Sequence, residues 1–336
     1  MQITVLAGGV GGARFIRGLR HHLDTHGAAW DPSTGTGARI TVVGNTGDDI
    51  TLLGLRICPD LDTVLYTLGG GVAEEQGWGR DQESYAVANE LRALEVGPDW
   101  FTLGDRDLGT HLARTQWLSA GHSLTDVTAR LARRWGLPER GIDLIPVTDE
   151  PIETHVVIAD EGQGEYGADS AERAVHFQQW WIQLQASVPA RRFITAGLNR
   201  ASAAPGVLSA IREADVVLIP PSNPVVSVGI ITSVPGVRDA LRGTRAPVVG
   251  VSPIIDGAPV RGHAQACLAP LGIPVTAAGV AGLYRDFLNG WLVDDADADA
   301  DYGSVRVEHR DLLMRDVPSA SAIAGQALTL AETLRP

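Results

Sequence analysis

The stretch ITVLAGGVGGARFIRGL, residues 3–19, decides the fold of this chain. Its first four residues are apolar, as in a short buried parallel strand. Glycines follow at positions 8, 9, 11 and 12, and Phe15, Ile16 and Leu19 then recur at helical spacing. A strand, a glycine turn and a helix N-terminus form an anion site, because free N–H groups and the positive end of the helix dipole point outward. Glycine also lets a phosphate approach the backbone closely.

This glycine turn matches no standard nucleotide motif. Read as GxGxxG from its second glycine, the last glycine is replaced by Arg14, and no Lys-Ser/Thr pair follows as in a Walker A loop. We therefore predict only a phosphate or nucleotide site, formed by Gly8, Gly9, Val10, Gly11 and Gly12. The alternative is a tight strand-to-helix turn that binds no ligand.

A second stretch, ITVVGNTGDDITLLGLRICPDLD at residues 40–62, repeats the pattern and adds carboxylates. Another apolar strand runs into a glycine turn, and Asp48, Asp49, Asp60 and Asp62 follow. Mg²⁺ prefers one or two carboxylates plus phosphate oxygens, so this pattern indicates a divalent metal ion that holds a diphosphate. The alternative role for these aspartates is helix capping or turn hydrogen bonding.

The composition is that of a globular protein with an acidic balance. The chain has 336 residues, of which 44% are hydrophobic, and a net charge of −13. This acidity argues against nucleic-acid or anionic-membrane partners. It does not argue against a nucleotide, because amides, arginines and a metal can balance the negative charge of a nucleotide locally. Cys58 and Cys267 form no metal-binding or disulfide pattern. No signal peptide or membrane span is predicted, so we expect a cytoplasmic protein.

Two further apolar runs, near residues 215 and 247, complete a recurring order of strand, loop and helix. We predict an α/β fold, a Rossmann-like doubly wound and mostly parallel sheet with its site along one edge. Residues 1–70 and 196–336 should form this core. Residues 71–195 should form an inserted, partly helical lobe or lid, with a loop or hairpin tip at 161–172.

Three other groups are candidates for ligand contacts. Ser222 and Asn223 lie in the PPSNP turn after a predicted strand and suit phosphate or base contacts, although turns also favour both residues. Arg106 and His111 could donate hydrogen bonds to a phosphate or a ring carbonyl. Alternatively, they belong to a local ion-pair cluster. Trp181, in HFQQWWIQL at 176–184, could stack on a planar ligand or simply pack in the core.

Seven ordered motifs together resemble the CofD/FbiA family, the 2-phospho-L-lactate transferases of coenzyme F420 biosynthesis. These motifs are AGGVGGARF (7–15), GNTGDD (44–49), CPDLDTVLYTLGGG (58–71), LGDRDLGTHLART (103–115), HFQQWW (176–181), PPSNPVVSVG (220–229) and SPIIDGAPVRG (252–262). The resemblance runs from the first residues to about Val293. The HFQQWW motif is most similar to the actinobacterial branch of the family.

The resemblance implies a Mg²⁺-dependent transfer reaction. A phosphoenolpyruvyl or 2-phospho-L-lactyl group passes from a guanosine diphosphate-linked donor to the ribityl hydroxyl of the deazaflavin Fo (7,8-didemethyl-8-hydroxy-5-deazariboflavin), and GMP leaves. The choice between enolpyruvyl and lactyl donors rests on branch likeness alone. We also expect a homodimer, with no nucleic-acid or membrane partner. The alternative is a nucleotide-sugar-binding regulator of the wider superfamily; a Rossmann oxidoreductase is disfavoured by Arg14.

The same resemblance suggests roles for the candidate residues. The glycine turn would cradle the donor diphosphate, Asp48 and Asp62 would bind Mg²⁺, and Asp49 or Asp48 would accept or orient the attacking hydroxyl. Ser222 and Asn223 would hold the nucleotide. The candidates for contact with Fo are Asn45, Asp49, Arg106, His111 and Trp181.

Overall fold

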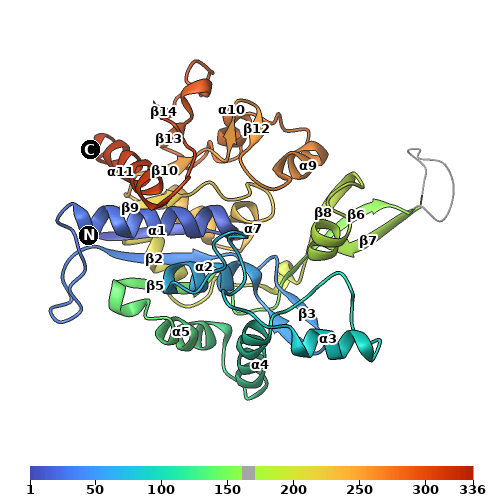
Figure 1. Ribbon diagram of the computed structural model, residues 1–336. Coiled ribbons are helices and arrows are strands. Elements are labelled where there is room, and N and C mark those ends of the chain that lie inside the picture. Colours follow the sequence, from blue (N-terminus) through green and yellow to red (C-terminus); the bar gives the residue numbers. More distant parts are fainter. Residues whose placement is uncertain (161–170, 336) are drawn as a thin grey trace.

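Seven parallel strands form the central sheet of this computed structural model, which describes residues 1–160 and 171–335 (Figure 1). The strand order is β14-β13-β10-β9-β1-β2-β5, and every neighbouring pair is parallel. The predicted Rossmann-like α/β class is confirmed. The strands are Gln2–Ala7 (β1), Arg39–Gly44 (β2), Ile142–Pro146 (β5), Val216–Ile219 (β9), Val248–Val251 (β10), Gly290–Val293 (β13) and Arg306–His309 (β14).

Helices cover both faces of this sheet, each over its own apolar cluster. Side chains alternate along β1, so that Val5 packs on one face and Leu6 on the other. The first face is covered by α1 (Gly9–Thr25), α2 (Pro59–Gly69), α5 (Leu124–Arg134) and α11 (Val317–Thr333). The second is covered by α6 (Val207–Arg212), α7 (Val228–Ser233), α8 (Val237–Gly243) and α10 (Ala277–Gly282).

The direction of the chain across the sheet reverses between β1 and β9. From β1 the sheet continues through β2 to β5, whereas from β9 it continues through β10 to β14 on the other side. The loops that follow β1 and β9 therefore lie next to each other at this point of the sheet. In doubly wound sheets ligands bind at this switch point, at the carboxyl ends of the strands.

Smaller elements extend from the core. An antiparallel sheet of β6 (Glu153–Ala159), β7 (Glu172–His176) and β8 (Ala190–Ala196) projects to one side (Figure 1). Two hairpins pair β3 (Ile50–Leu52) with β4 (Leu55–Ile57) and β11 (Ile254–Ile255) with β12 (Ala258–Pro259). The remaining helices are α3 (Ala86–Ala93), α4 (Asp105–Ser119) and α9 (Ala264–Leu268), with short turns at Pro138–Arg140, Gln179–Gln183, Leu198–Arg200, Ala269–Leu271 and Asp295–Asp297.

The segment 71–195 does not lie wholly apart from the core. Its strand β5 pairs with β2 along five residues and forms one edge of the central sheet, while β6 and β7 belong to the projecting sheet. The division of the chain into a core and an inserted lobe stays a prediction. Of the loop predicted at 161–172, residues 161–170 lie outside the described residues. None of the helices described has the length and apolar character needed to cross a membrane.

Candidate active site

The glycine turn lies where β1 meets α1, with two other loops packed tightly against it. Gly8 is the extended N-cap residue of α1, and Gly9 has a positive φ of 63°. A Cβ at Gly8 would lie 2.5 Å from Asp60 Oδ2, and one at Gly11 would collide with the carbonyl oxygen of Pro221. The glycines are required here because the start of α2 and the loop after β9 approach the backbone directly.

Ser222 joins the loop after β9 to the glycine turn. Its hydroxyl donates to the Gly8 carbonyl at 2.8 Å and accepts from the Gly8 N–H at 3.2 Å. Asn223 instead accepts the N–H groups of Val225 and Val226 within its own turn, at 2.9 and 3.2 Å. The structure thus places Ser222 at the predicted site as a brace for the turn, and uses the Asn223 carbonyl oxygen in local turn bonding.

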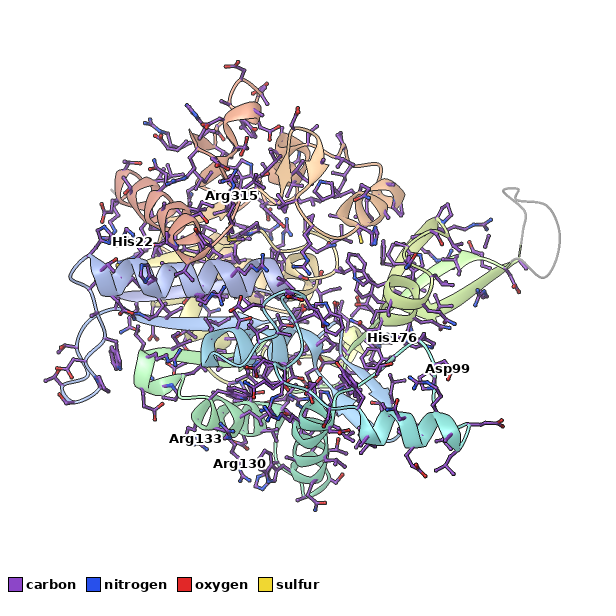
Figure 2. The ribbon with its side chains drawn as sticks, in the orientation of Figure 1. His22, Asp99, Arg130, Arg133, His176 and Arg315 are labelled. Carbon is purple, nitrogen blue, oxygen red and sulfur yellow. The ribbon has the colours of Figure 1, made fainter. Side chains whose placement is uncertain are left out.

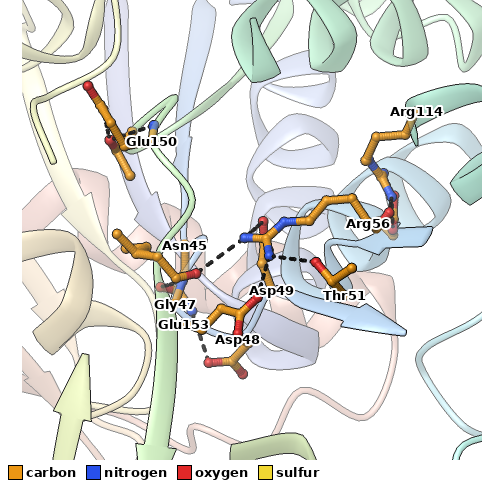
Figure 3. A network of polar contacts seen from close by, with 12 residues as sticks. Asn45, Gly47, Asp48, Asp49, Thr51, Arg56, Arg114, Glu150 and Glu153 are labelled. Atoms are coloured by element: carbon orange, nitrogen blue, oxygen red, sulfur yellow. Dashed lines mark hydrogen bonds and ion pairs between the residues drawn. The ribbon is translucent and has the colours of Figure 1, made fainter. Parts of the chain in front are cut away.

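Asn45, Asp48 and Asp60 form the second wall of the site. The side-chain amide of Asn45 donates to Asp60 Oδ2 at 2.8 Å, to Asp48 Oδ1 at 3.3 Å and to the Val226 carbonyl at 3.1 Å (Figure 3 shows Asn45 and Asp48). All three side chains are buried. The amide therefore links a carboxylate of the loop after β2 to one in the first turn of α2, and the second of these, Asp60, lies against the glycine turn.

The two carboxylates of this wall are in an unfavourable state without a cation. Burial, and then the negative charges of Asp60 and Asp49, raise the pKa of Asp48 well above its usual range. Burial also raises the pKa of Asp60 to about 6, although hydrogen bonds from Asn45, the Gly9 backbone and Ser227 oppose this. A divalent cation would relieve both effects, and paired carboxylates are the ligands that Mg²⁺ prefers. In the described part of the chain no group of three or more His, Cys, Asp or Glu side chains is arranged to hold a metal ion.

Asp49 points away from Asp48, toward Arg56. Its Oδ2 lies 3.4 Å from Nη2 of Arg56. The other terminal nitrogen of Arg56, Nη1, donates to Glu153 at 2.6 Å (Figure 3). Oδ1 of Asp49 is buried with no hydrogen-bond partner among the described residues. Burial raises the pKa of Asp49 to about 7, although the positive charge of Arg56 acts against it. A carboxyl group with this pKa can exchange a proton near neutral pH.

Asp62 belongs to a separate buried network between α2 and α4. Arg114, which is 1% exposed, binds its carboxylate through both terminal nitrogens, with Nη1 3.0 Å from Oδ2. His111 lies in the same network, with its Nδ1 3.1 Å from Arg114 Nη1 and its Nε2 3.4 Å from Asp107. The structure therefore does not bring Asp62 or His111 into the wall formed by Asn45, Asp48 and Asp60.

The projecting sheet is anchored to the loop that carries Asp48 and Asp49. The Thr154 N–H donates to the Gly47 carbonyl at 2.7 Å, and His176 Nε2 lies 3.1 Å from the Asp49 carbonyl. His176 is the last residue of β7, at the base of the sheet (Figure 2). These two bonds fix the acidic loop from the side opposite α2.

The other two candidates for contact with Fo lie away from this wall. Arg106 is exposed in the first turn of α4, where its N–H donates to Glu83. Trp181 packs edge-on against His263, with ring centroids 5.0 Å apart, and against Gly262. Of the five residues predicted to contact Fo, Asn45 and Asp49 belong to the loop that carries Asp48.

Asp60 belongs to the acidic pattern that predicted a metal site, but Asp62 and not Asp60 was predicted to bind Mg²⁺ together with Asp48. Asp60 and Asp62 are both in the first turn of α2, two positions apart, and so point in directions that differ by about 200° around the helix. Helical periodicity could have shown that one of them alone faces Asp48. Arg56 and Arg114 were also missed, because no local pattern marks a buried arginine whose partners lie far along the chain.

Comparison with known proteins identifies relatives along the whole chain. The family described as "2-phospho-L-lactate transferase CofD" matches residues 3–322. Proteins named "Phosphoenolpyruvate transferase" are similar: that of Thermobifida fusca is 53% identical over 339 residues, covering 100% of this chain and 99% of that protein. The protein of Streptomyces coelicolor is 52% identical, with 100% and 99% coverage, and that of Mycolicibacterium smegmatis is 47% identical, with 98% and 99% coverage.

A solved structure shares the fold at low sequence identity. Protein BH3568 from Bacillus halodurans superposes with a TM-score of 0.59 and 17% identity, covering 97% of this chain and 99% of that one. This likeness extends the fold assignment to both ends of the chain.

Proposed function

Because this chain belongs to the 2-phospho-L-lactate transferase CofD family, we propose that it transfers a phosphoenolpyruvyl group to the ribityl hydroxyl of Fo. The family and the names of the relatives support a transferase of coenzyme F420 biosynthesis. The donor in this proposal is a guanosine diphosphate-linked enolpyruvyl ester, and GMP is released. The enolpyruvyl donor is preferred to the lactyl one because the relatives at 47–53% identity are named for phosphoenolpyruvate.

One observation carries the proposal: the buried carboxylate of Asp60 lies against the glycine turn at the switch point of the sheet, and the Asn45 amide links it to the buried carboxylate of Asp48. Phosphoryl transfer asks a protein mainly for positioning and for neutralisation of charge. The amides at the start of α1 supply partial positive charge toward the diphosphate. Asp48 and Asp60 would hold Mg²⁺, which when bound withdraws charge from the phosphate oxygens and stabilises the leaving GMP.

Asp49 is the residue best suited to the attacking hydroxyl. Its pKa of about 7 lets it accept a proton near neutral pH, and its Oδ1 has no other partner in the described part of the chain. In the reaction the ribityl oxygen forms a bond to the phosphorus that carries the enolpyruvyl group. The bond from that phosphorus to the bridging oxygen of GMP breaks, and the hydroxyl proton passes to Asp49.

Asp62 is not included in the proposed metal site, in contrast to the expectation from sequence. Both of its oxygens are engaged by Arg114, and a carboxylate already neutralised by a buried guanidinium is a poor metal ligand. Asp60 takes its place because it shares the Asn45 amide with Asp48.

The test is a reaction of the purified protein with Fo, the enolpyruvyl donor and Mg²⁺. We expect GMP release and a deazaflavin product heavier than Fo by one phosphoenolpyruvyl group, both abolished by EDTA. A parallel reaction with the lactyl donor ranks the two donors. Absence of GMP release together with tight binding of a UDP-sugar would instead support the nucleotide-sugar-binding regulator. Light scattering of the same sample tests the expected homodimer.

A further inference from the structure

Two guanidinium groups meet beside the glycine turn. Arg14 lies one helical turn after Val10 on α1, and Arg261 comes from the loop between β12 and α9. A Cβ built on Gly77 would lie 2.9 Å from Val10 Cγ1, 3.0 Å from Arg261 Nη1 and 3.3 Å from Arg14 Nη2. Residues from three distant parts of the chain thus surround one point at the start of α1.

Neither arginine forms an ion pair with any residue that the structure describes. Arg14 Nη2 is 3.5 Å from the Glu74 carbonyl, and Arg261 Nη2 donates to the Gln76 carbonyl. The nearby carboxylate of Glu74 is bound by Arg17, at 2.5 Å. Two like charges therefore lie together, with backbone carbonyls as hydrogen-bond partners and with the Glu74 carboxylate, already bound by Arg17, as the acidic group that acts on Arg14.

The two guanidinium groups repel each other, and because Arg261 is exposed, solvent screens part of this repulsion. Burial and the charge of Arg14 lower the pKa of Arg261. The same point lies beside the first turn of α1, whose dipole adds further positive potential. An anionic group placed between the guanidiniums would turn repulsion into charge-assisted hydrogen bonds, for which arginine suits carboxylate and phosphate equally well.

We propose that Arg14 and Arg261 form an anion subsite for the donor, binding a carboxylate or phosphate group next to the diphosphate held by the glycine turn. This inference rests on the proposed function. The donor is the substrate that carries such groups: a guanosine diphosphate-linked enolpyruvyl ester has two phosphates and one carboxylate. The subsite would fix the register of the donor along α1, so that its reacting phosphorus faces Asp48 and Asp60.

The experiment measures GDP binding by calorimetry, in the presence of Mg²⁺, and steady-state kinetics with the enolpyruvyl donor. Arg14→Gln, Arg261→Gln and the double variant are compared with wild type. Arg245→Gln is the matched control, because it removes the same charge from an exposed loop at the amino end of β10, whereas the glycine turn follows the carboxyl end of β1. Thermal melting checks that each variant is folded. Arg14→Lys and Arg261→Lys test whether the planar guanidinium itself is needed.

If the subsite binds a phosphate, each Gln variant weakens GDP binding by about tenfold. If it binds the carboxylate, GDP binding is unchanged, while the KM for the donor rises by about tenfold and kcat stays within about threefold of wild type. The inference is overturned if folded Gln variants match the Arg245→Gln control in both measurements. A wild-type protein that binds GDP but turns over no donor would contradict the proposed function, and the GDP measurement would still decide the phosphate subsite.

Discussion

Asp48 and Asp60 share a single hydrogen-bond donor, the Asn45 amide nitrogen, which lies 3.3 Å from an oxygen of the first and 2.8 Å from an oxygen of the second. The negative charge of Asp60 raises the pKa of Asp48, and the Mg²⁺ that we propose would lie beside these two carboxylates.

Asp60→Asn should lower turnover by about 100-fold or more. The variant loses a ligand of the proposed Mg²⁺, which would neutralise charge in the transition state. It should also remove the rise in melting temperature that Mg²⁺ gives the wild-type protein, measured by scanning calorimetry. Asp48→Asn should behave in the same way. If Asp62→Asn abolished the Mg²⁺ effect in a folded protein while Asp60→Asn kept it, the assignment made from sequence would be restored.

Asp62→Asn should act on stability instead. It leaves Arg114 buried with its charge unpaired, a change that costs about 3–5 kcal/mol. Chemical denaturation measures this loss in the free energy of unfolding. The control is Asp143→Asn, which breaks the more exposed ion pair with Arg39 and should cost no more than about 1 kcal/mol. Equal losses in the two variants would argue against a structural role for Asp62.

The stability of the metal-free protein should depend on the ionisation of Asp60. The pKa of Asp60 is raised to about 6 on folding, so the unfolded chain loses this proton at a lower pH than the folded protein does. The free energy of unfolding therefore falls as pH rises from about 4 to above 6. The Asp60→Asn variant escapes this penalty and should gain on the order of 2 kcal/mol relative to wild type between pH 4 and pH 7. Denaturation in EDTA at several pH values measures the difference. A gap that stayed constant with pH would contradict the raised pKa.

Gly11→Ala should disrupt the meeting of the two loops at the switch point. Its Cβ would collide with the Pro221 carbonyl and push the Ser222 loop away from the glycine turn. We expect weaker GDP binding together with a lower melting temperature. Gly109→Ala is the matched control, because that glycine lies inside α4 with open space around it. The control should be neutral or stabilising by up to about 1 kcal/mol. Similar GDP affinity in both variants would contradict this prediction.

The fold and the position of the site could be predicted from sequence because their signals are local. Apolar strands near residues 3, 40, 215 and 247, each followed by a turn, correspond to β1, β2, β9 and β10 of the central sheet. The carboxyl ends of parallel strands meet at one edge, so the glycine turn, the Asp48 loop and Ser222 had to lie near one another.

The partners of individual side chains could not be predicted in this way. Whether Asp60 or Asp62 faces Asp48 depends on the rotation of α2, and the fate of Asp62 depends on Arg114, which is 52 residues away. His111 was a candidate for contact with Fo, yet the packing of α4 against α2 places it in the Asp62–Arg114 network. Such contacts are set by tertiary packing, which residue patterns along one segment do not encode.

The bonds between Gly8 and Ser222 span 214 positions of the chain, and the bond from Asn45 to the Val226 carbonyl spans 181. A nascent polypeptide therefore carries its complete glycine turn and Asp48, Asp49 and Asp60 long before Ser222 and Val226, which brace them, have been synthesised. Shortening the chain from its C-terminal end to before residue 222 would leave every acidic residue of the proposed centre in place and still yield no assembled centre. Assembly of the proposed centre thus requires the chain to extend past Val226, and fragments that retain only the first half of the chain should be inert.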